Sequence, residues 1–512
     1  MTVADNKRIA KNTIYLYIRT FVSMAIALYT SRIVLDTLGV EDFGIFGVVG
    51  GVMALFAVLS NSMSVATQRF LTFELGKKGN GEFQKVFSMV CIIHALIGLI
   101  FIFLSETVGL WFVNTYLNIP SDRMTAANIV YQISVISTAI SILQIPYNSA
   151  VVSYERMHVY AYVGLGESVA KLLIVFLLIT SPIDKLVMYA ILLLGLKIIG
   201  CTVYRLYCIR KLPGCHIKII WDKDLFKAIA EFTGWNLFGS VAGTAKTQST
   251  NIYINIFGGP AFNATMGVAG QVSVAINSLV SGFQSAANPQ LTKNYAAGDS
   301  EATCRLLYKS SKISFLLMLI VSLPVFFEID YILNLWLVDV PPLAVLFTRL
   351  IIVECLFDTL AGPMTTSLLA TGHIKWYQIA IGSIHLLNIP ITYFFLMEGC
   401  YIATPLVVSI VLVMLSNVSR LFFCRNMLGL SLKTYLGEVV VPICMVCLLS
   451  VIPVVMVVLV MEPSFFRLIL TVFVSVTTVV VFAYSIGLNH SERQFILNII
   501  RPRLYQILRI RN

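Results

Sequence analysis

Long apolar segments recur along nearly the whole chain of 512 residues. A helix that crosses a bilayer needs about 20 consecutive, mainly apolar residues, and fourteen segments satisfy this condition. Because backbone polar groups inside a bilayer must be paired within the chain, each segment is predicted to be an α-helix. The fourteen segments cover residues 12–35, 45–68, 86–109, 126–150, 159–180, 186–207, 232–257, 262–287, 308–328, 343–369, 376–397, 401–423, 438–460 and 466–488.

The charge content of the chain agrees with this interpretation. Charged residues form only 12% of the chain, which is about half of the roughly 25% found in ordinary soluble domains. The mean hydropathy is +0.87. A soluble protein is therefore excluded, and the predicted fold class is an all-α polytopic membrane protein with about 14 transmembrane helices.

Lysine and arginine residues are concentrated on one side of the predicted helices. If the N-terminus is cytoplasmic, the segments that face the cytoplasm hold 27 of the 36 Lys and Arg residues, whereas the outer loops hold only Arg123, Lys185 and Arg467. Such an excess is typical of cytoplasmic loops. Both termini are therefore predicted to be cytoplasmic, and the net charge of +11 follows from topology and does not indicate a nucleic-acid partner.

A weak internal repeat divides the chain. Pro146 and Tyr160 are separated by fourteen residues, as are Pro363 and Tyr377. Six predicted spans separate equivalent positions, so the two halves have the same orientation. Two parallel six-helix lobes are a plan of transporters, whose substrate sites lie at the interface of the repeats. The predicted parts are an N-terminal lobe (1–210), a C-terminal lobe (211–433), an extra helix pair (434–488) and a basic cytoplasmic tail (489–512).

Polar residues follow helical stripes in four of the predicted spans, which belong to both lobes. Ser, Thr and Asn also join membrane helices to each other, but four whole stripes favour a hydrated cavity. The residues predicted to line this cavity are Ser23 in the first span, Ser64 and Gln68 in the second, Asn236, Ser240, Thr244, Asn251 and Asn255 in the seventh, and Asn277 and Ser281 in the eighth.

Charged residues inside the predicted spans indicate what this cavity binds. A charge at the centre of a bilayer is costly, so it faces a cavity or a partner. Arg19 and Lys246 have no acidic residue within one helical turn, and we predict that they bind an anion. Glu167 and Lys171, by contrast, are spaced to pair with each other. Further candidates for the anion site are Arg32, Arg349 and Lys197.

Glu354 and Asp358 are like charges one turn apart in an apolar helix. This arrangement suits reversible protonation or sodium binding, so both residues are candidates for ion coupling. The alternative is that Arg349 or a lysine of another helix neutralises them. No ATP-binding motif, hydrolase motif or metal-ligand spacing is found, so neither an enzyme nor a bound cofactor is predicted.

Residues 30–49 read TSRIVLDTLGVEDFGIFGVV, and this segment resembles Wzx-type polysaccharide flippases. These flippases belong to the MOP superfamily, together with MATE multidrug exporters and the lipid II flippase MurJ. The resemblance implies alternating access and a cationic cavity that accepts an undecaprenyl-pyrophosphate-linked oligosaccharide. It also implies that cations of the first, second and seventh helices face this cavity, as Arg19 and Lys246 would. The extra helix pair is similar to that of MurJ, where it forms a groove for the lipid tail.

Together these features predict an ion-coupled flippase of the bacterial inner membrane that moves lipid-linked repeat units for surface polysaccharide or lipopolysaccharide biosynthesis. Its expected partners are this lipid-linked saccharide, the membrane lipids and the polysaccharide polymerase machinery. A MATE-type drug exporter and a lipid II flippase are the nearest alternatives. A membrane enzyme is disfavoured because the longest outer loops, about 110–125 and 329–342, are short. A scaffold explains neither the repeat nor the polar stripes.

Overall fold

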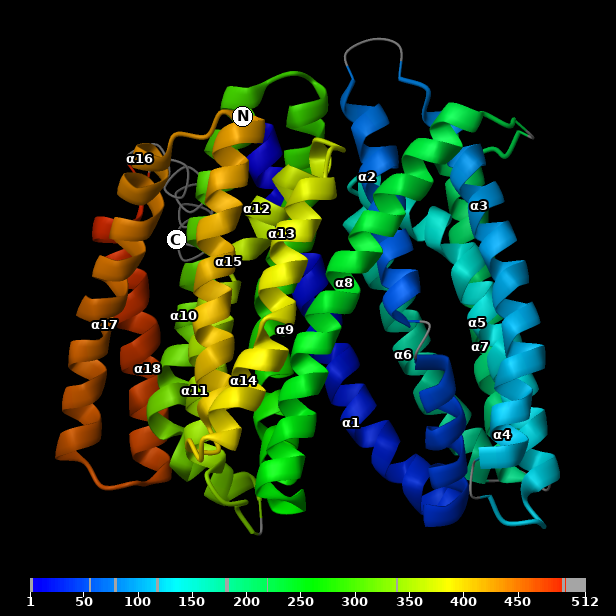
Figure 1. Ribbon diagram of the computed structural model, residues 1–512, viewed down its shortest axis with the longest axis horizontal. Coiled ribbons are helices and arrows are strands. Elements are labelled where there is room, and N and C mark those ends of the chain that lie inside the picture. Colours follow the sequence, from blue (N-terminus) through cyan, green and yellow to red (C-terminus); the bar gives the residue numbers. More distant parts are fainter. Residues whose placement is uncertain are drawn as a thin grey trace, which may run out of the picture. The chain divides into compact units, whose positions relative to one another are not determined.

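The computed structural model describes residues 3–54, 57–77, 81–116, 119–179, 184–218, 220–337, 339–489 and 493. Every regular element in these ranges is a helix (Figure 1). Ten helical segments are long and apolar enough to cross a membrane. The predicted all-helical membrane fold is thus confirmed, although ten of the described helices, and not fourteen, meet the criteria of length and composition.

The four predicted spans that do not meet these criteria are polar or divided. They fall in α1 (Val3–Ala54), α2 (Ala57–Gly76), α8 (Lys223–Gly258) and the short successive helices α11 (Ala344–Asp358) and α12 (Ala361–Ala370). Three of these spans carry the polar stripes noted above, and the fourth carries Glu354 and Asp358. The helices that resemble lipid-facing spans least are therefore the ones that carry most of the candidate site residues.

The chain divides into two compact units. The N-terminal unit comprises residues 10–240 and 295–297, and the C-terminal unit comprises 1–9, 241–294 and 298–512. The N-terminal unit contains α1 to α7 and the first part of α8, where the remaining bounds are α3 (Phe83–Leu104), α4 (Leu110–Tyr116), α5 (Met124–Ser153), α6 (Met157–Ile179) and α7 (Lys185–Lys211).

The C-terminal unit contains the rest of α8 and all later helices. Their bounds are α9 (Pro260–Ala296), α10 (Ser300–Trp336), α11 and α12 as above, α13 (Lys375–Leu386), α14 (Asn388–Met397), α15 (Thr404–Leu428), α16 (Leu432–Tyr435), α17 (Val441–Val460) and α18 (Phe465–Phe482).

The division falls inside α8 because the start of this helix packs on the N-terminal unit. Ile229 is buried in a hydrophobic core with residues of α3 and α5, and the Phe232 ring lies 5.7 Å from that of Phe70. The predicted boundary between the two lobes lies earlier, in the loop after residue 210. Residues 490–492 and 494–512 of the predicted basic tail lie outside the described residues.

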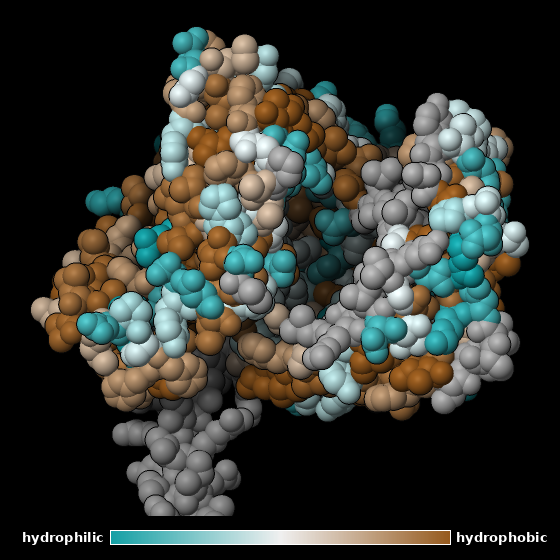
Figure 2. All heavy atoms as spheres, turned by 90° about the horizontal axis from the view of Figure 1, so that it is seen from below, coloured by the Kyte–Doolittle hydropathy of each residue, from teal (hydrophilic) through white to brown (hydrophobic). Residues whose placement is uncertain are grey.

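Large apolar side chains cover much of the surface, as expected for helices that face lipid. Val460 and Phe473 in the extra helix pair are 84% and 66% exposed. Figure 2 shows broad hydrophobic areas among hydrophilic side chains on one end of the molecule.

The helix that carries Arg19 is bent and anchored in the N-terminal unit. Gly39 interrupts α1 with φ 77° and ψ 169°, a conformation that is strained for other residues. Beyond the bend, Asp42 binds the Arg123 guanidinium at 2.5 Å, and Arg123 binds Asp184 at 2.6 Å. The hydrogen bond from Arg123 lowers the pKa of Asp184. Arg123 therefore connects α1 to the beginnings of α5 and α7.

A buried ion pair fixes the extra helix pair to α10. The Glu328 side chain is completely buried, and its Oε2 atom lies 2.8 Å from Arg467 Nη2. Thr471 Oγ1 donates to the other carboxylate oxygen at 2.8 Å. The charge distribution predicts Arg467 in an outer loop, but this residue lies in the first turn of α18. Both oxygens of Glu328 are thus satisfied by one helix.

We expect Glu328→Ala to destabilise the protein by about 3–5 kcal/mol, because it leaves the Arg467 charge buried without its partner. The double variant Glu328→Leu/Arg467→Met should recover most of this loss. Thermal unfolding of the purified protein in detergent measures both effects. Asp330→Ala, at an exposed position of the same helix, is the control. A double variant that is no more stable than Glu328→Ala would contradict the proposed coupling.

Candidate functional site

Each unit contains a polar cavity. The cavity of the N-terminal unit has a volume of about 400 Å³ and lies between α1, α6 and α7. Its lining residues are Arg19, Ser23, Ile26, Thr30, Val34, Gly164, Glu167, Ser168, Lys171 and Tyr189.

Arg19 is the most distinctive residue of this cavity. Its Cζ atom lies 4.3 Å from the centre of the Tyr160 ring, within the range of a cation–π contact. The Nε atom is buried and has no hydrogen-bond partner. No carboxylate pairs with Arg19 among the described residues. An arginine held by an aromatic ring, but not neutralised, remains available to an anion.

One face of α6 shapes the surroundings of Arg19. Tyr160, Gly164 and Ser168 follow at intervals of four residues, so they lie on one side of the helix. Ser168 Oγ donates to Ser23 Oγ of α1 at 2.8 Å. A side chain at Gly164 would collide with the Arg19 guanidinium. This face is not among the predicted site residues, although its four-residue spacing is present in the sequence.

The sequence predicts that Arg19 binds an anion, and farnesyl pyrophosphate serves as a probe of this prediction. If Arg19 binds its pyrophosphate, Gly164→Ala should weaken that binding by about tenfold, because the new methyl group displaces the Arg19 guanidinium. Gly166→Ala is a matched control on the same helix, since a Cβ atom there meets nothing within 4 Å. Equilibrium binding to the purified protein in detergent measures the difference. Equal affinities of the two variants would show that the position of Arg19 does not depend on Gly164.

Glu167 and Lys171 both line the N-terminal cavity. The predicted ion pair between them is not formed within the described residues. Glu167 instead approaches α7, where a Cβ atom at Gly200 would lie 2.5 Å from Glu167 Oε1. With Arg19 and Lys171 positive and Glu167 negative, the formal charge of this cavity is +1.

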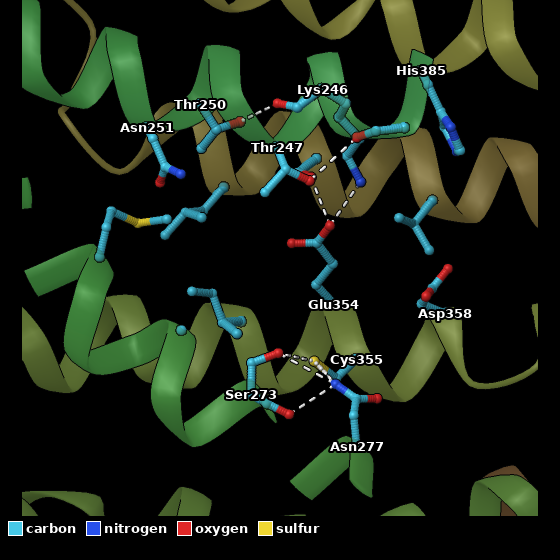
Figure 3. Close-up of a pocket in the computed structure, with 17 residues that line it drawn as sticks. Lys246, Thr247, Thr250, Asn251, Ser273, Asn277, Glu354, Cys355, Asp358 and His385 are labelled. Atoms are coloured by element: carbon cyan, nitrogen blue, oxygen red, sulfur yellow. Dashed lines mark hydrogen bonds and ion pairs between the residues drawn. The ribbon is translucent and has the colours of Figure 1, made fainter. Parts of the chain in front are cut away.

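The cavity of the C-terminal unit is larger, with a volume of about 510 Å³. Its polar lining comes from five helices (Figure 3). These residues are Lys246, Thr247, Thr250 and Asn251 of α8, Ser273 and Asn277 of α9, Glu354 and Asp358 of α11, His385 of α13, and Ser409 of α15.

Lys246 is paired with a carboxylate from another helix. Its Nζ atom lies 2.7 Å from Glu354 Oε1, and Ser409 Oγ donates to the same oxygen at 2.7 Å. The sequence showed no acidic residue within one turn of Lys246, and the structure supplies one from α11. A lysine of another helix therefore neutralises Glu354, which is the alternative to ion coupling given above for this residue.

Asp358 differs from Glu354 in its surroundings. It is exposed in the cavity and forms no hydrogen bond or ion pair with any residue that the structure describes. It is the last residue of α11, where the helix is interrupted. Asn417 donates to the Phe357 carbonyl at 2.7 Å and Gln284 donates to the Thr359 carbonyl at 3.1 Å. These amides satisfy carbonyls beside the break, as a membrane interior requires.

The remaining predicted cations lie away from both cavities or cannot be placed. Arg349 Nε donates to the Phe326 carbonyl at 3.1 Å, and its guanidinium lies over the Phe326 ring. Lys197 is half-buried on α7 and lines neither cavity. The side chain of Arg32 lies outside the described part of the chain.

The polar stripes divide between the cavities and helix contacts. Ser23 lines the N-terminal cavity, and Asn251 and Asn277 line the C-terminal one. Asn236 donates to the Ser62 carbonyl and Ser240 accepts from the Ser62 hydroxyl, so these two residues join α8 to α2. The other stripe residues line neither of the two cavities: Ser64, Gln68, Thr244, Asn255 and Ser281.

Comparisons with known proteins agree with the fold. Residues 241–394 match the MatE family model, and no protein of curated function matches the sequence. A multidrug resistance MATE family transporter of the MOP superfamily, in an outward-facing conformation, has a similar structure. The TM-score is 0.72 at 12% identity, over 83% of this chain and 96% of that one.

Two other solved structures are similar over the same shares of the chains, 83% and 96%. A MOP superfamily transporter from Pyrococcus furiosus, whose binding pocket of reversed polarity is described as suggesting a different function, has a TM-score of 0.71 at 12% identity. A MATE structure in the straight conformation has 0.71 at 13% identity. The chain thus has the fold of MATE transporters and is a multi-pass membrane protein.

Proposed function

We propose that this protein is a transporter that moves an anionic, lipid-linked saccharide across the membrane. The more specific proposal is a Wzx-type flippase for undecaprenyl-pyrophosphate-linked repeat units, which delivers them by alternating access to surface polysaccharide synthesis. The observation that carries the proposal is Arg19, which lines a cavity of net positive charge and has no carboxylate partner among the described residues.

The chemistry of arginine suits a pyrophosphate. A guanidinium presents planar donors that bind phosphate oxygens in pairs, and it remains charged at any physiological pH. Attraction between fixed charges is several-fold stronger in a cavity of low dielectric constant than in water. Tyr160 holds the guanidinium through a cation–π contact, which uses none of its N–H donors for a hydrogen bond. Lys171 adds a second positive charge to the same cavity.

Of the two carboxylates in the C-terminal cavity, Asp358 is the better candidate for ion coupling. Glu354 is neutralised by Lys246, whereas Asp358 forms no such pair. We therefore assign reversible binding of a proton or sodium ion to Asp358. The protein would act in the bacterial inner membrane with both termini in the cytoplasm, as its charge distribution predicts.

A MATE-type exporter of cationic drugs is a second candidate function. It is favoured by the match of residues 241–394 to the MatE family model and by the exposed carboxylate of Asp358. It gives no role to Arg19, because an unpaired guanidinium repels a cation. A lipid II flippase would use the same cation chemistry, so Arg19 does not separate it from the first proposal.

Expression in two bacterial strains tests these alternatives. One strain lacks its own repeat-unit flippase, and the other lacks its drug exporters. If the protein is a flippase, surface polysaccharide is restored in the first strain and drug susceptibility is unchanged in the second. Drug resistance without restored polysaccharide would support the exporter and refute the flippase.

A further inference from the structure

We propose that the C-terminal cavity is a saccharide-binding site that accepts neutral and amino sugars and rejects acidic sugars. This inference rests on the proposed function, because it assigns the carbohydrate part of the lipid-linked substrate to a defined cavity. Its starting point is the charge of the cavity, which differs in sign from that of the N-terminal cavity.

The C-terminal cavity contains one lysine and two carboxylates. Lys246 and Glu354 neutralise each other at 2.7 Å, and Lys246 is only 8% exposed. While Asp358 holds no proton or sodium ion, it leaves the cavity a formal charge of −1. A ligand anion would have to displace Glu354 from Lys246 and also approach Asp358. A carboxylate or phosphate is therefore disfavoured in this cavity.

The lining of the cavity is polar rather than apolar. Ten of its 17 residues carry a polar or charged side chain (Figure 3). Sites for drug-like molecules are lined mainly by apolar and aromatic side chains. The volume of about 510 Å³ lies within the range of about 300–1,000 Å³ for small-molecule sites. The ligand class is therefore small and rich in hydrogen-bonding groups.

Unused hydrogen-bonding groups in the cavity match hydroxyl groups. The Nδ2 atom of Asn277 donates to Ser273, while its Oδ1 atom accepts from none of the residues that the structure describes. Neither oxygen of Asp358 accepts a hydrogen bond from a residue that the structure describes. A sugar hydroxyl both donates and accepts, so a saccharide can satisfy both residues, and an amino group would pair with Asp358.

Three synthetic ligands test the proposal. Each is a methyl glycoside, of glucose, of glucosamine with a free amine, or of glucuronic acid, so that each probes the C-terminal cavity alone. Because the three share the pyranose ring and are compared in sodium-free buffer, differences in affinity arise from the amine or the carboxylate. Equilibrium binding to the purified full-length protein in detergent gives three dissociation constants, and their ratios do not depend on the amount of active protein.

We expect the wild type to bind the glucose and glucosamine ligands about tenfold more tightly than the glucuronate ligand, because Asp358 repels the uronate. Asp358→Asn should reduce this discrimination to about twofold by improving binding of the glucuronate ligand, a gain that misfolding cannot produce. Asp330→Asn removes an exposed carboxylate of α10 outside the cavity and should leave the ratios unchanged.

Equal affinity of the wild type for all three ligands, or unchanged ratios in Asp358→Asn, would overturn the saccharide site while leaving the proposed function intact. Failure of the wild type to bind any of the three glycosides would overturn the saccharide site alone, and failure to bind farnesyl pyrophosphate as well would reject both proposals.

Discussion

Replacement of Arg19 by alanine is expected to abolish polysaccharide export, because the variant loses the guanidinium of the N-terminal cavity, which no described carboxylate neutralises. The pyrophosphate must leave a hydrated headgroup layer, and a fixed guanidinium offsets part of that desolvation. Complementation of a flippase-deficient strain, scored by surface polysaccharide, measures the effect, and the abundance of the protein in the membrane is measured alongside.

Two further variants define the chemistry at this position. Arg19→Lys should retain only part of the activity, since an ammonium group keeps the charge but cannot bind phosphate oxygens as a planar pair of donors. Arg305→Ala, which removes an exposed arginine that pairs with Glu301 on the surface of α10, should export at the wild-type level. Full complementation by Arg19→Ala would show that the anion-binding role is wrong.

Replacement of Lys246 by alanine is expected to reduce both stability and export, for a different reason. The substitution leaves Glu354 in a largely buried position with only the Ser409 hydroxyl as a partner. Removing one member of a buried ion pair costs about 3–5 kcal/mol. Thermal unfolding in detergent should show a lower melting temperature, and the amount of protein in the membrane should fall.

Removal of the second charge distinguishes an ion pair from an anion site. The double variant Lys246→Ala/Glu354→Ala should regain most of the lost stability, because neither charge is then left unpaired. If Lys246 served mainly to bind the substrate anion, Lys246→Ala would leave stability unchanged and the double variant would show no recovery. Asp358→Ala is the matched control, since it removes a carboxylate from the same cavity without breaking the pair.

Much of the fold follows from the sequence because bilayers impose strict local requirements. Apolar segments such as 308–328 and 438–460 could be predicted from hydropathy alone, and both lie inside described helices. The spans that were harder to define are those that face polar surroundings. α8, for example, carries polar residues along its length and fails a hydropathy criterion that its neighbours meet.

The candidate site was only partly predictable. Ser23, Asn251 and Asn277 were predicted to line one cavity, and Glu354 and Asp358 to couple an ion. The structure instead places Arg19 and Ser23 in one cavity and the other four residues in a second one. The partners of the charges were not predicted, because they are distant in sequence. Lys246 and Glu354 are 108 residues apart, and Arg467 and Glu328 are 139 apart. Helical periodicity reports only neighbours within a few turns, so it cannot identify such pairs.

The interpretation of the polar stripes shows the same limit. Asn236 and Asn251 occupy one stripe of α8 with equivalent spacing, yet Asn236 joins α8 to α2 whereas Asn251 lines a cavity. Membrane helices use the same side chains for contacts and for hydrated surfaces. Only the packing of the neighbouring helices determines which role each residue has.

Transport by the purified protein tests the central claim most directly. The protein is reconstituted into liposomes that carry a fluorescent undecaprenyl-pyrophosphate disaccharide, and loss of fluorescence to a membrane-impermeant quencher reports movement of the lipid between leaflets. Parallel liposomes contain the Arg19→Ala variant or a fluorescent cationic drug. The proposed function predicts rapid movement of the lipid with the wild type, none above protein-free liposomes with Arg19→Ala, and no uptake of the drug. Uptake of the cationic drug without movement of the lipid would contradict it.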